Sequence, residues 1–534
     1  MIIQSFPYSY SPIDVFRNFK DYPYSSLLLS GIKNPKWGRY SFMTAFPYMV
    51  FKSKGKEISI LINGEEIKKK GNPFNILREI YTEQSGKQNL PSSLPFTGGM
   101  LGYFGYDMGF TLEKIASKAT DDLQLPDCIL PFYDWVLYWD HKTKESFILW
   151  INTPKEKKSK IKELLNKNPH FKETNNFYFN PVGNNPENIR DVLPKARISN
   201  GTNLRSNFKK EDYFNAIAKA KDYIKKGDIF QVNLSQRFSC SYNASPFELF
   251  EKLAFINPAP FSAFLNFPEV SVVSSSPERF LYLNRNKIHT RPIKGTRPRG
   301  TNKEKDKLLS KELLNSAKDR AELIMIVDLE RNDLGKFCYY GSVKIRELVT
   351  LETHPTVFHT VSTIEGKIVD TMTPVDCVKY SFPGGSITGA PKVRSMEIIE
   401  ELEPTRRNIY TGAIGYISFN RRMDLNIAIR TIIIKDKTAH FQVGGGIVAD
   451  SNPELEYEET LHKGKALAQS LLVIKNGYRS SVIGYRNKYQ TAKTEKLTKR
   501  LKQEDKYDSA VINLKEVTKI FNRQPKETLS DVEK

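Results

Sequence analysis

Cysteine is scarce in this chain, with four residues among 534. The four lie far apart, and their spacing does not match that of a zinc or iron–sulfur site. Such sparse cysteine is typical of a reducing compartment and predicts no disulfide framework. The residues are Cys128, Cys240, Cys338 and Cys377.

Long apolar runs are also lacking. No window approaches the roughly 18 uninterrupted apolar residues that a membrane helix requires. The first residues, MIIQSFP, contain neither the basic region nor the apolar region of an export signal. We therefore expect a cytoplasmic protein with no membrane partner.

Acidic residues are outnumbered by basic ones, 60 against 81, which leaves a formal net charge of +21. Basic surface attracts phosphate backbones, so nucleic-acid binding is an alternative to be weighed. The lysines are spread along the chain, however, and zinc-finger spacing, a basic zipper and an aromatic RNA-binding signature are absent from the sequence. We expect no nucleic-acid partner, and we interpret the excess charge as lysine-rich compositional bias that incidentally favours a dianionic substrate.

The chain is organised in long segments of different composition. Residues 1–151 alternate short apolar runs with turns such as Asn63-Gly64, which predicts a β-rich N-terminal domain. Residues 152–207 are rich in Lys, Asn, Pro and Thr and suit a connecting segment. Residues 208–474 then carry the chemical motifs of a catalytic domain, and residues 475–534 form a charged tail to which the sequence assigns no role.

One lysine has an unusual setting. The run TRPIKGTRPR, residues 290–299, places Lys294 among three arginines beside a Gly-Thr turn. To attack as a free amine near pH 7, a lysine needs its pKa lowered by about three units, and nearby cations together with desolvation supply such a shift. Arg291 and Arg297 are candidate neighbours. A basic surface turn is the alternative interpretation.

A carboxylate precedes this lysine at a break between strands. Apolar and β-branched runs predict strands over Phe261–Phe267, Val270–Ser276 and Phe280–Leu283, and Glu278 lies where the second ends and the third begins. The strand break fixes the direction of Glu278, which makes it a candidate acid or base. A simple ion pair with Arg279 is the alternative.

Two pairs of carboxylates repeat at helical spacing. Asp319 and Glu322 lie three residues apart in an apolar segment, and Glu456 and Glu459 repeat that spacing. Each pair falls on one face of its helix. Two such helices can form an oxygen site for Mg²⁺, which favours a few carboxylates, waters and a substrate oxygen. Periodicity alone leaves solvated helix faces as the alternative.

Together these motifs resemble the chorismate-utilising family, which includes anthranilate synthase component I, the isochorismate and salicylate synthases and aminodeoxychorismate synthase component I. The resemblance extends from about Tyr24 to about Leu472. Within the family, the string Pro-Ile-Lys-Gly-Thr is similar to that of the aminodeoxychorismate branch, where this lysine is the covalent nucleophile and anthranilate synthases have alanine. The resemblance implies an α+β fold with an antiparallel β-sandwich core and helices packed outside.

The resemblance also implies a set of site residues. It gives catalytic roles to Lys294, Glu278 and His359. It makes Glu322 and Glu459 direct ligands of Mg²⁺, and Asp319 and Glu456 ligands through water. Chorismate carries two carboxylates that must be compensated when buried, and Mg²⁺ and Arg430 fill that need. The implied substrate-binding residues are Gly295, Thr296, Ser386, Tyr410, Arg430, Gly444, Gly445, Gly446 and Lys463.

The reaction implied by the resemblance converts chorismate and ammonia to 4-amino-4-deoxychorismate through a covalent lysine intermediate, for 4-aminobenzoate and folate synthesis. None of the cysteines lies in a glycine-flanked nucleophile elbow, so we expect a separate glutamine amidotransferase subunit to supply the ammonia. The alternative is anthranilate synthase component I of the tryptophan pathway. Lys294 argues against it, as does Leu29, which replaces the glutamate of the Leu-Leu-Glu-Ser segment in the tryptophan pocket of those enzymes. A chorismate-binding regulator without turnover is a further alternative.

Overall fold

The computed structural model describes most of the chain, and residues 475–534, the predicted tail, lie outside the described part. The described residues all belong to one compact unit, Met1–Leu472. The described ranges are 1–31, 38–86, 94–167, 204–354 and 357–471.

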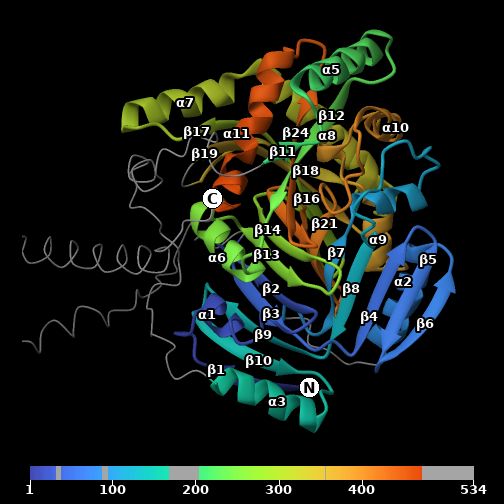
Figure 1. Cartoon of the computed structure of the whole chain (residues 1–534), viewed down its shortest axis with the longest axis vertical. Helices are drawn as coiled ribbons and strands as arrows, with labels where there is room; N and C mark the ends of the chain where they lie inside the picture. Colours follow the sequence, from blue (N-terminus) through green and yellow to red (C-terminus); the bar gives the residue numbers. More distant parts are fainter. Residues whose placement is uncertain (32–37, 87–93, 168–203, 355–356, 472–534) are drawn as a thin grey trace, which may run out of the picture. The chain divides into compact units, whose positions relative to one another are not determined.

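Two antiparallel sheets, each of twelve described strands, form this unit (Figure 1). Their strands are short runs rich in β-branched and aromatic residues, separated by Gly, Pro and Asn at the turns. The first sheet contains, in spatial order, β1 (Ile2–Phe6), β10 (Glu145–Trp150), β9 (Trp135–Asp140), β3 (Tyr40–Thr44), β2 (Ser25–Leu29), β13 (Phe261–Asn266), β14 (Ser271–Ser276), β23 (Thr431–Lys435), β24 (Thr438–Ile447), β12 (Gln231–Ser241) and β11 (Arg205–Ser206), with β20 (Gly389–Ala390) paired to β12.

The second sheet is built in the same way. It contains β17 (Ile293–Pro298), β19 (Val357–Lys367), β16 (Lys287–Arg291), β15 (Arg279–Asn284), β22 (Arg422–Ile427), β21 (Ala413–Ser418), β7 (Gly99–Phe104), β8 (Cys128–Tyr133), β4 (Met49–Lys54), β5 (Glu57–Ile62) and β6 (Glu65–Lys70), with β18 (Lys344–Thr353) paired to β19. The three strands predicted around Glu278 are β13, β14 and β15, so that part of the prediction is confirmed.

Large apolar side chains fill the space between the sheets. Because successive side chains of a strand point to opposite faces, strands such as β8 and β9 are buried along their whole length. Phe42 of the first sheet and Tyr416 of the second meet edge to face, with ring centroids 5.2 Å apart. The predicted antiparallel sandwich is therefore confirmed.

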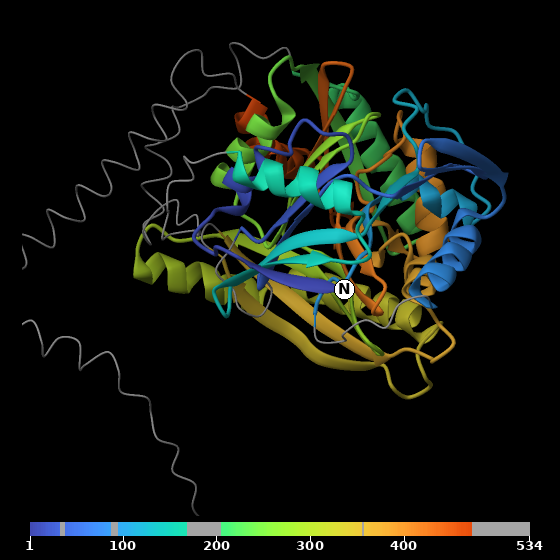
Figure 2. The same ribbon diagram turned by 90° about the horizontal axis from the view of Figure 1, so that it is seen from below.

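Helices cover the outer faces of both sheets. The apolar sides of α1, α3, α6 and α11 pack on the first sheet, and those of α2, α8 and α9 pack on the second. Helices α5 and α10 pack together on β12 of the first sheet. In the view from below, the teal helix α3 and the yellow strands β18 and β19 lie on opposite sides of the blue strands of the first sheet (Figure 2). The helices are α1 (Pro12–Phe16), α2 (Pro73–Gly86), α3 (Lys155–Asn166), α5 (Lys210–Lys225), α6 (Pro246–Ile256), α7 (Lys303–Asn315), α8 (Ala317–Gly335), α9 (Pro374–Ser381), α10 (Lys392–Leu402) and α11 (Pro453–Leu471), with short 3₁₀ turns η1 (Tyr106–Thr111) and η2 (Gly385–Ile387).

Both sheets combine strands from before residue 152 with strands from after residue 207. β2 pairs with β13, and β7 pairs with β21. On its other side β7 pairs with β8, where a Cβ on Gly102 would lie 2.0 Å from the carbonyl oxygen of Ile129, so only glycine allows these two strands to approach this closely. The segment 152–207 stays a prediction as a domain boundary.

Among the described helices, none is both long enough and apolar enough to cross a membrane.

Candidate active site

Lys294 lies on β17 at a bulge in its pairing with β19. Lys294 is opposite Thr360 and Thr296 is opposite His359, while Gly295 between them has a positive φ of 71°. A Cβ on Gly295 would lie 2.7 Å from Thr360 Oγ1 and 2.9 Å from Leu313 Cδ1. Glycine is therefore required for the bulge that sets the direction of the lysine.

The amine of Lys294 donates a hydrogen bond to the carbonyl oxygen of Ser386 at 3.0 Å. Burial lowers the pKa of Lys294, and Lys463 lowers it further, although Glu322 and Glu278 act in the opposite direction. The net shift is downward, which favours the neutral, nucleophilic amine.

The two neighbouring arginines do not produce this shift. Arg291 forms an ion pair with Glu352 at 2.7 Å, and Arg297 forms one with Glu312 at 2.8 Å. Their charges are thus compensated by carboxylates of their own. The hypothesis that these arginines lower the pKa of Lys294 is replaced by burial together with Lys463.

Glu278 lies between β14 and β15, as expected, and is 5% exposed. Its Oε1 accepts a hydrogen bond from Ser386 Oγ at 2.7 Å. Burial raises its pKa, and Ser386 and Lys294 partly oppose that rise. Glu278 does not pair with Arg279, because the Arg279 guanidinium binds Asp424 through two hydrogen bonds of 2.8 Å. The carboxyl of Glu278 therefore faces Ser386 and the amine of Lys294.

His359 lies on β19 beside the bulge. Its Nδ1 is 2.9 Å from Thr296 Oγ1, and its ring meets that of His354 edge to face with centroids 5.2 Å apart. Burial lowers the pKa of His359 to about 3, with His354 and Arg430 adding to the effect. The imidazole is therefore neutral at physiological pH and exchanges a hydrogen bond with Thr296.

The first carboxylate pair lies on α8, near Lys294. Burial raises the pKa of Glu322, which Lys294 partly opposes. Asp319 is held at the rim by Arg297, with 3.2 Å between Arg297 Nη2 and Asp319 Oδ2. Both residues are partly accessible to solvent. Their segment forms helix α8, so the helix that the spacing of the two acids predicted is confirmed.

The second carboxylate pair lies on α11 above three consecutive glycines of β24. A Cβ on Gly445 would be 3.3 Å from Glu456 Oε2 and 3.8 Å from Glu459 Oε1, so both carboxylates reach the glycine backbone. Burial raises the pKa of Glu456, with Ser451 opposing. Burial also acts to raise the pKa of Glu459, but the ammonium group of Lys463, 2.6 Å away, outweighs burial, so the pKa of Glu459 is lowered.

The donor set of these four acids matches what Mg²⁺ prefers, since it consists of oxygen ligands from two helices on one side of Lys294. Within the ranges that the structure describes, no group of three or more His, Cys, Asp and Glu side chains is close enough to hold a metal ion by itself. Magnesium thus stays a prediction.

The three glycines run along β12, with Gly444 opposite Ser235 and Gly446 opposite Asn233. Lys463 donates a hydrogen bond to the carbonyl oxygen of Gly444 at 2.9 Å, which joins α11 to this strand. A Cβ on Gly446 would lie 2.1 Å from Gln231 Nε2. The glycines therefore keep the backbone open beside the acidic residues.

Gln231 is a residue that the sequence analysis missed. It is fully buried at the start of β12, and among the described residues neither its amide oxygen nor its amide nitrogen has a hydrogen-bond partner. A buried amide without partners is costly, so Gln231 is a candidate substrate contact. The only signal in the sequence is one glutamine in the apolar run Ile229–Leu234.

Arg430 lies in the connection between β22 and β23 with a positive φ of 51°. Burial lowers its pKa, and Tyr410 partly opposes that shift. In the described part of the chain, the Arg430 guanidinium has no hydrogen bond or ion pair. Its charge also contributes to the low pKa of His359. A guanidinium in this state is suited to bind a carboxylate.

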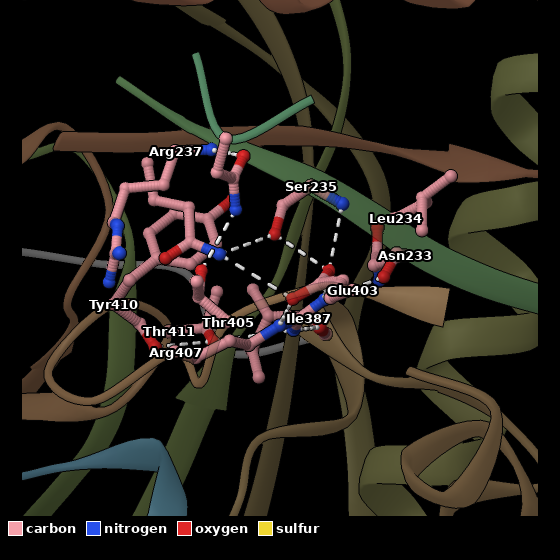
Figure 3. Close-up of polar contacts among 12 residues, drawn as sticks. Asn233, Leu234, Ser235, Arg237, Ile387, Glu403, Thr405, Arg407, Tyr410 and Thr411 are labelled. Atoms are coloured by element: carbon pink, nitrogen blue, oxygen red, sulfur yellow. Dashed lines mark hydrogen bonds and ion pairs between the residues drawn. The ribbon is translucent and has the colours of Figure 1, made fainter. Parts of the chain in front are cut away.

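A buried ion pair, Glu403–Arg407, supports the substrate side of the site (Figure 3). Arg407 binds Glu403 through two hydrogen bonds of 2.6 and 2.9 Å, and it also donates to the carbonyl oxygens of Ile387 and Asn233. Its guanidinium lies 5.7 Å from the ring centroid of Tyr410. The pair thus connects η2, β12 and the loop that carries Tyr410.

The structure brings Lys294, Glu278, Ser386 and Glu322 to one place, with Lys463 and Glu459 beside them. Thr296 is more exposed and contacts His359 on the neighbouring strand β19. None of the predicted site residues lines the cavity of about 640 Å³ whose wall includes Leu28 and Leu29.

Three comparisons with known proteins identify what this chain is similar to. The sequence model of one family, described as chorismate binding enzyme, matches residues 32–469. Anthranilate synthase component 1 from Acetivibrio thermocellus is 39% identical over 474 residues, which cover 86% of this chain and 92% of the relative. Aminodeoxychorismate synthase component 1 from Escherichia coli K12 is 37% identical over 456 residues, which cover 85% and 95%. The crystal structure of anthranilate synthase component I from Streptococcus pneumoniae has a TM-score of 0.68 at 30% identity, covering 82% of this chain and 93% of that one.

Proposed function

Because the chain belongs to the chorismate-binding enzyme family and acts on chorismate, we propose that it converts chorismate and ammonia to 4-amino-4-deoxychorismate. In this proposal the chain is a transferase that serves 4-aminobenzoate and folate synthesis. The observation that carries it is the amine of Lys294, which has a lowered pKa and lies beside Glu278 and Ser386. The E. coli relative named aminodeoxychorismate synthase component 1 supports the same reaction.

The two carboxylates of chorismate require two cationic partners, because burying an unpaired carboxylate is costly. Arg430 supplies one partner, since its guanidinium can bind a carboxylate through two parallel hydrogen bonds. Tyr410 and the backbone amides of the three glycines add donors on the same side. Gln231 has a free amide with which to complete this set.

Magnesium is the second cationic partner in this proposal. Glu322 and Glu459 would hold it directly, and Asp319 and Glu456 through water. The donor chemistry supports this assignment, and burial raises the pKa of Glu322 and of Glu456, whose charged forms a cation would stabilise. When bound, Mg²⁺ supplies charge compensation for the ring carboxylate of the substrate.

The chemical steps follow from the side chains. The neutral amine of Lys294 attacks C2 of the ring, the two double bonds shift, and the C4 hydroxyl leaves as water after receiving a proton. Ammonia then adds at C4, the double bonds shift back, and the C2–N bond to Lys294 breaks. Glu278 is the group that moves protons between the amine and the reacting atoms, and His359 serves the hydroxyl. The net reaction consumes chorismate and ammonia and releases one water.

Ammonia is the second substrate. We propose that a separate glutamine amidotransferase subunit delivers it, in agreement with the component 1 designation of the relatives. Free ammonium would be a poorer source, because only the neutral ammonia is a nucleophile.

A second candidate function is anthranilate synthesis, in which pyruvate is eliminated and the ring becomes aromatic. It is favoured by the relatives named anthranilate synthase component 1, which match the chain at 35–39% identity. The presence of Lys294 distinguishes the two candidates, since a covalent lysine is needed only for the first mechanism.

The test incubates the purified chain with chorismate, Mg²⁺ and ammonium at alkaline pH, with products identified by mass and fluorescence. An aminated product that retains the enolpyruvyl group is expected. Fluorescent anthranilate would favour the second candidate instead. Chorismate that remains unchanged with ammonium, and also with an added amidotransferase subunit, would contradict both.

A further inference from the structure

Glu330 is a buried carboxylate beside the active site. It belongs to none of the sequence motifs and has no part in the proposed chemical steps. It is on α8, on the side that packs against η2, and is 2% exposed. Its Oε1 accepts a hydrogen bond from the backbone amide of Gly385 at 3.1 Å. Its Oε2 is buried and has no hydrogen-bond partner in the described ranges. The carboxylate therefore makes one specific contact, and that contact is with η2.

This contact lies next to both reacting side chains. Gly385 is followed by Ser386. The carbonyl oxygen of Ser386 accepts a hydrogen bond from the Lys294 amine, and its hydroxyl donates one to Glu278. Gly385 packs closely against α8, because a Cβ there would lie 2.7 Å from Leu329 Cδ2. The position of Gly385 thus decides where Ser386 presents its two hydrogen-bonding atoms.

The described residues place no ion-pair partner on the Glu330 carboxylate, whereas the neighbouring carboxylate of Asp333 is paired with two lysines. Asp333, on the next turn of α8, binds Lys392 at 2.5 Å and Lys336 at 2.9 Å. Burial raises the pKa of Glu330 to about 7, Asp333 contributes to the rise, and Lys392 opposes it. Glu278 faces it from the other side and raises it too. A hydrocarbon side chain would fill this place without such a penalty.

We propose that Glu330 is a positioning residue of the active site. It holds Gly385 and thereby sets Ser386 against Lys294 and Glu278. This role rests on the proposed function in one respect, namely that Lys294 and Glu278 act on chorismate. It is the same whether the product is 4-amino-4-deoxychorismate or anthranilate.

The test compares Glu330→Leu with Glu330→Gln, using chorismate consumption so that the identity of the product does not matter. Leucine removes the acceptor, so kcat should fall by at least about tenfold, the effect of losing one buried hydrogen bond. KM should stay within about threefold of the wild-type value, because Arg430 and the three glycines of β24 do not contact Glu330. Glutamine keeps an acceptor oxygen and should restore most of kcat.

A pH profile separates positioning from a general loss of stability. Above its pKa of about 7, Glu330 is ionised and is a like charge near Glu278. In Glu330→Gln this charge is gone, so the limb of the kcat profile that lies at or above about pH 7 should move to lower pH. Asp328→Asn is the matched control, because it removes a carboxylate from the exposed side of the same helix.

A second measurement does not depend on turnover. Amide hydrogen exchange of the peptide around Gly385 should become faster in Glu330→Leu and stay unchanged in Glu330→Gln. Wild-type exchange and kcat in the leucine variant would overturn the proposal. Equal loss of kcat in both variants with an unshifted pH profile would also overturn it. If the wild-type chain fails to consume chorismate, the proposed function fails and the exchange result alone decides the positioning role.

Discussion

At the scale of single residues, the amine of Lys294 decides which reaction the site performs. We expect Lys294→Ala to reduce formation of the aminated product by at least about a thousandfold, because the nucleophile is lost while the binding groups remain. Mass spectrometry of the chorismate reaction measures this. Lys252→Ala is a matched control, since burial also lowers the pKa of Lys252, to about 8, but this lysine is on α6. A Lys294→Ala variant that makes the product at the wild-type rate would contradict the covalent mechanism.

His141 predicts a pH dependence of stability. It lies between Tyr8 and Ser41, and burial lowers its pKa to about 4. The unfolded chain therefore binds a proton near pH 6.5 that the folded chain binds only near pH 4. The contribution of His141 is complete above pH 6.5 and is lost as the pH falls toward 4, by at most about 3 kcal/mol.

The variant His141→Gln cannot take up this proton but can still hydrogen-bond to Ser41. Urea unfolding at a series of pH values should therefore show a smaller loss of unfolding free energy between pH 6.5 and 4 than in the wild-type chain. The same pH dependence in both proteins would show that the histidine does not titrate as expected.

The sequence was informative about residues whose type and spacing carry chemistry. Lys294, Glu278 and the two acidic pairs were chosen from their motifs, and the structure brings Lys294, Glu278 and Glu322 together. Gln231 and Glu330 were missed, because nothing in a linear sequence says that one glutamine or glutamate of an apolar segment is buried beside a site. The cause of the lysine pKa shift was also assigned wrongly, since ion-pair partners of Arg291 and Arg297 come from distant segments.

At the scale of elements, the bulge in β17 is the feature on which the direction of Lys294 depends. Gly295→Ala should reduce kcat by at least about tenfold, because the added Cβ collides with Thr360 and Leu313 and the backbone has a positive φ. Steady-state kinetics with chorismate measures the change.

Gly227→Ala is the control for this variant. Gly227 also has a positive φ, of 81°, but a Cβ there would meet nothing within 4 Å. Both variants should lose about 1 kcal/mol of unfolding free energy from backbone strain, and only Gly295→Ala should lose activity. Full activity in Gly295→Ala would show that the bulge does not direct the lysine.

Elements with strong periodicity were predictable, and their partners were not. Tyr213, Ile217 and Ala220 repeat at helical spacing and form the buried side of α5, which ends at Lys225, two residues before Gly227. The pairing of β2 with β13 joins residues more than two hundred positions apart. Local patterns contain no information on such a pairing, because register is decided by the packing of both sheets.

At the scale of the whole molecule, both sheets contain strands from before residue 152 and from after residue 207. We therefore expect the described unit to unfold in a single transition. The four tryptophans lie at positions 37, 135, 139 and 150, so their fluorescence reports only on the first part of the chain. Far-UV circular dichroism reports on all strands and helices. We expect the two signals to change at the same urea concentration. Two separate midpoints would support an independent domain at residues 1–151.

The shared sheets have a consequence for synthesis on the ribosome. β2 and β7 leave the ribosome early, but their partners β13 and β21 end at Asn266 and Ser418. At usual elongation rates, β7 waits roughly ten seconds to a minute for its neighbour. During that time the nascent chain displays apolar strands with unsatisfied backbone edges, which makes it a natural client for chaperones that bind emerging polypeptides.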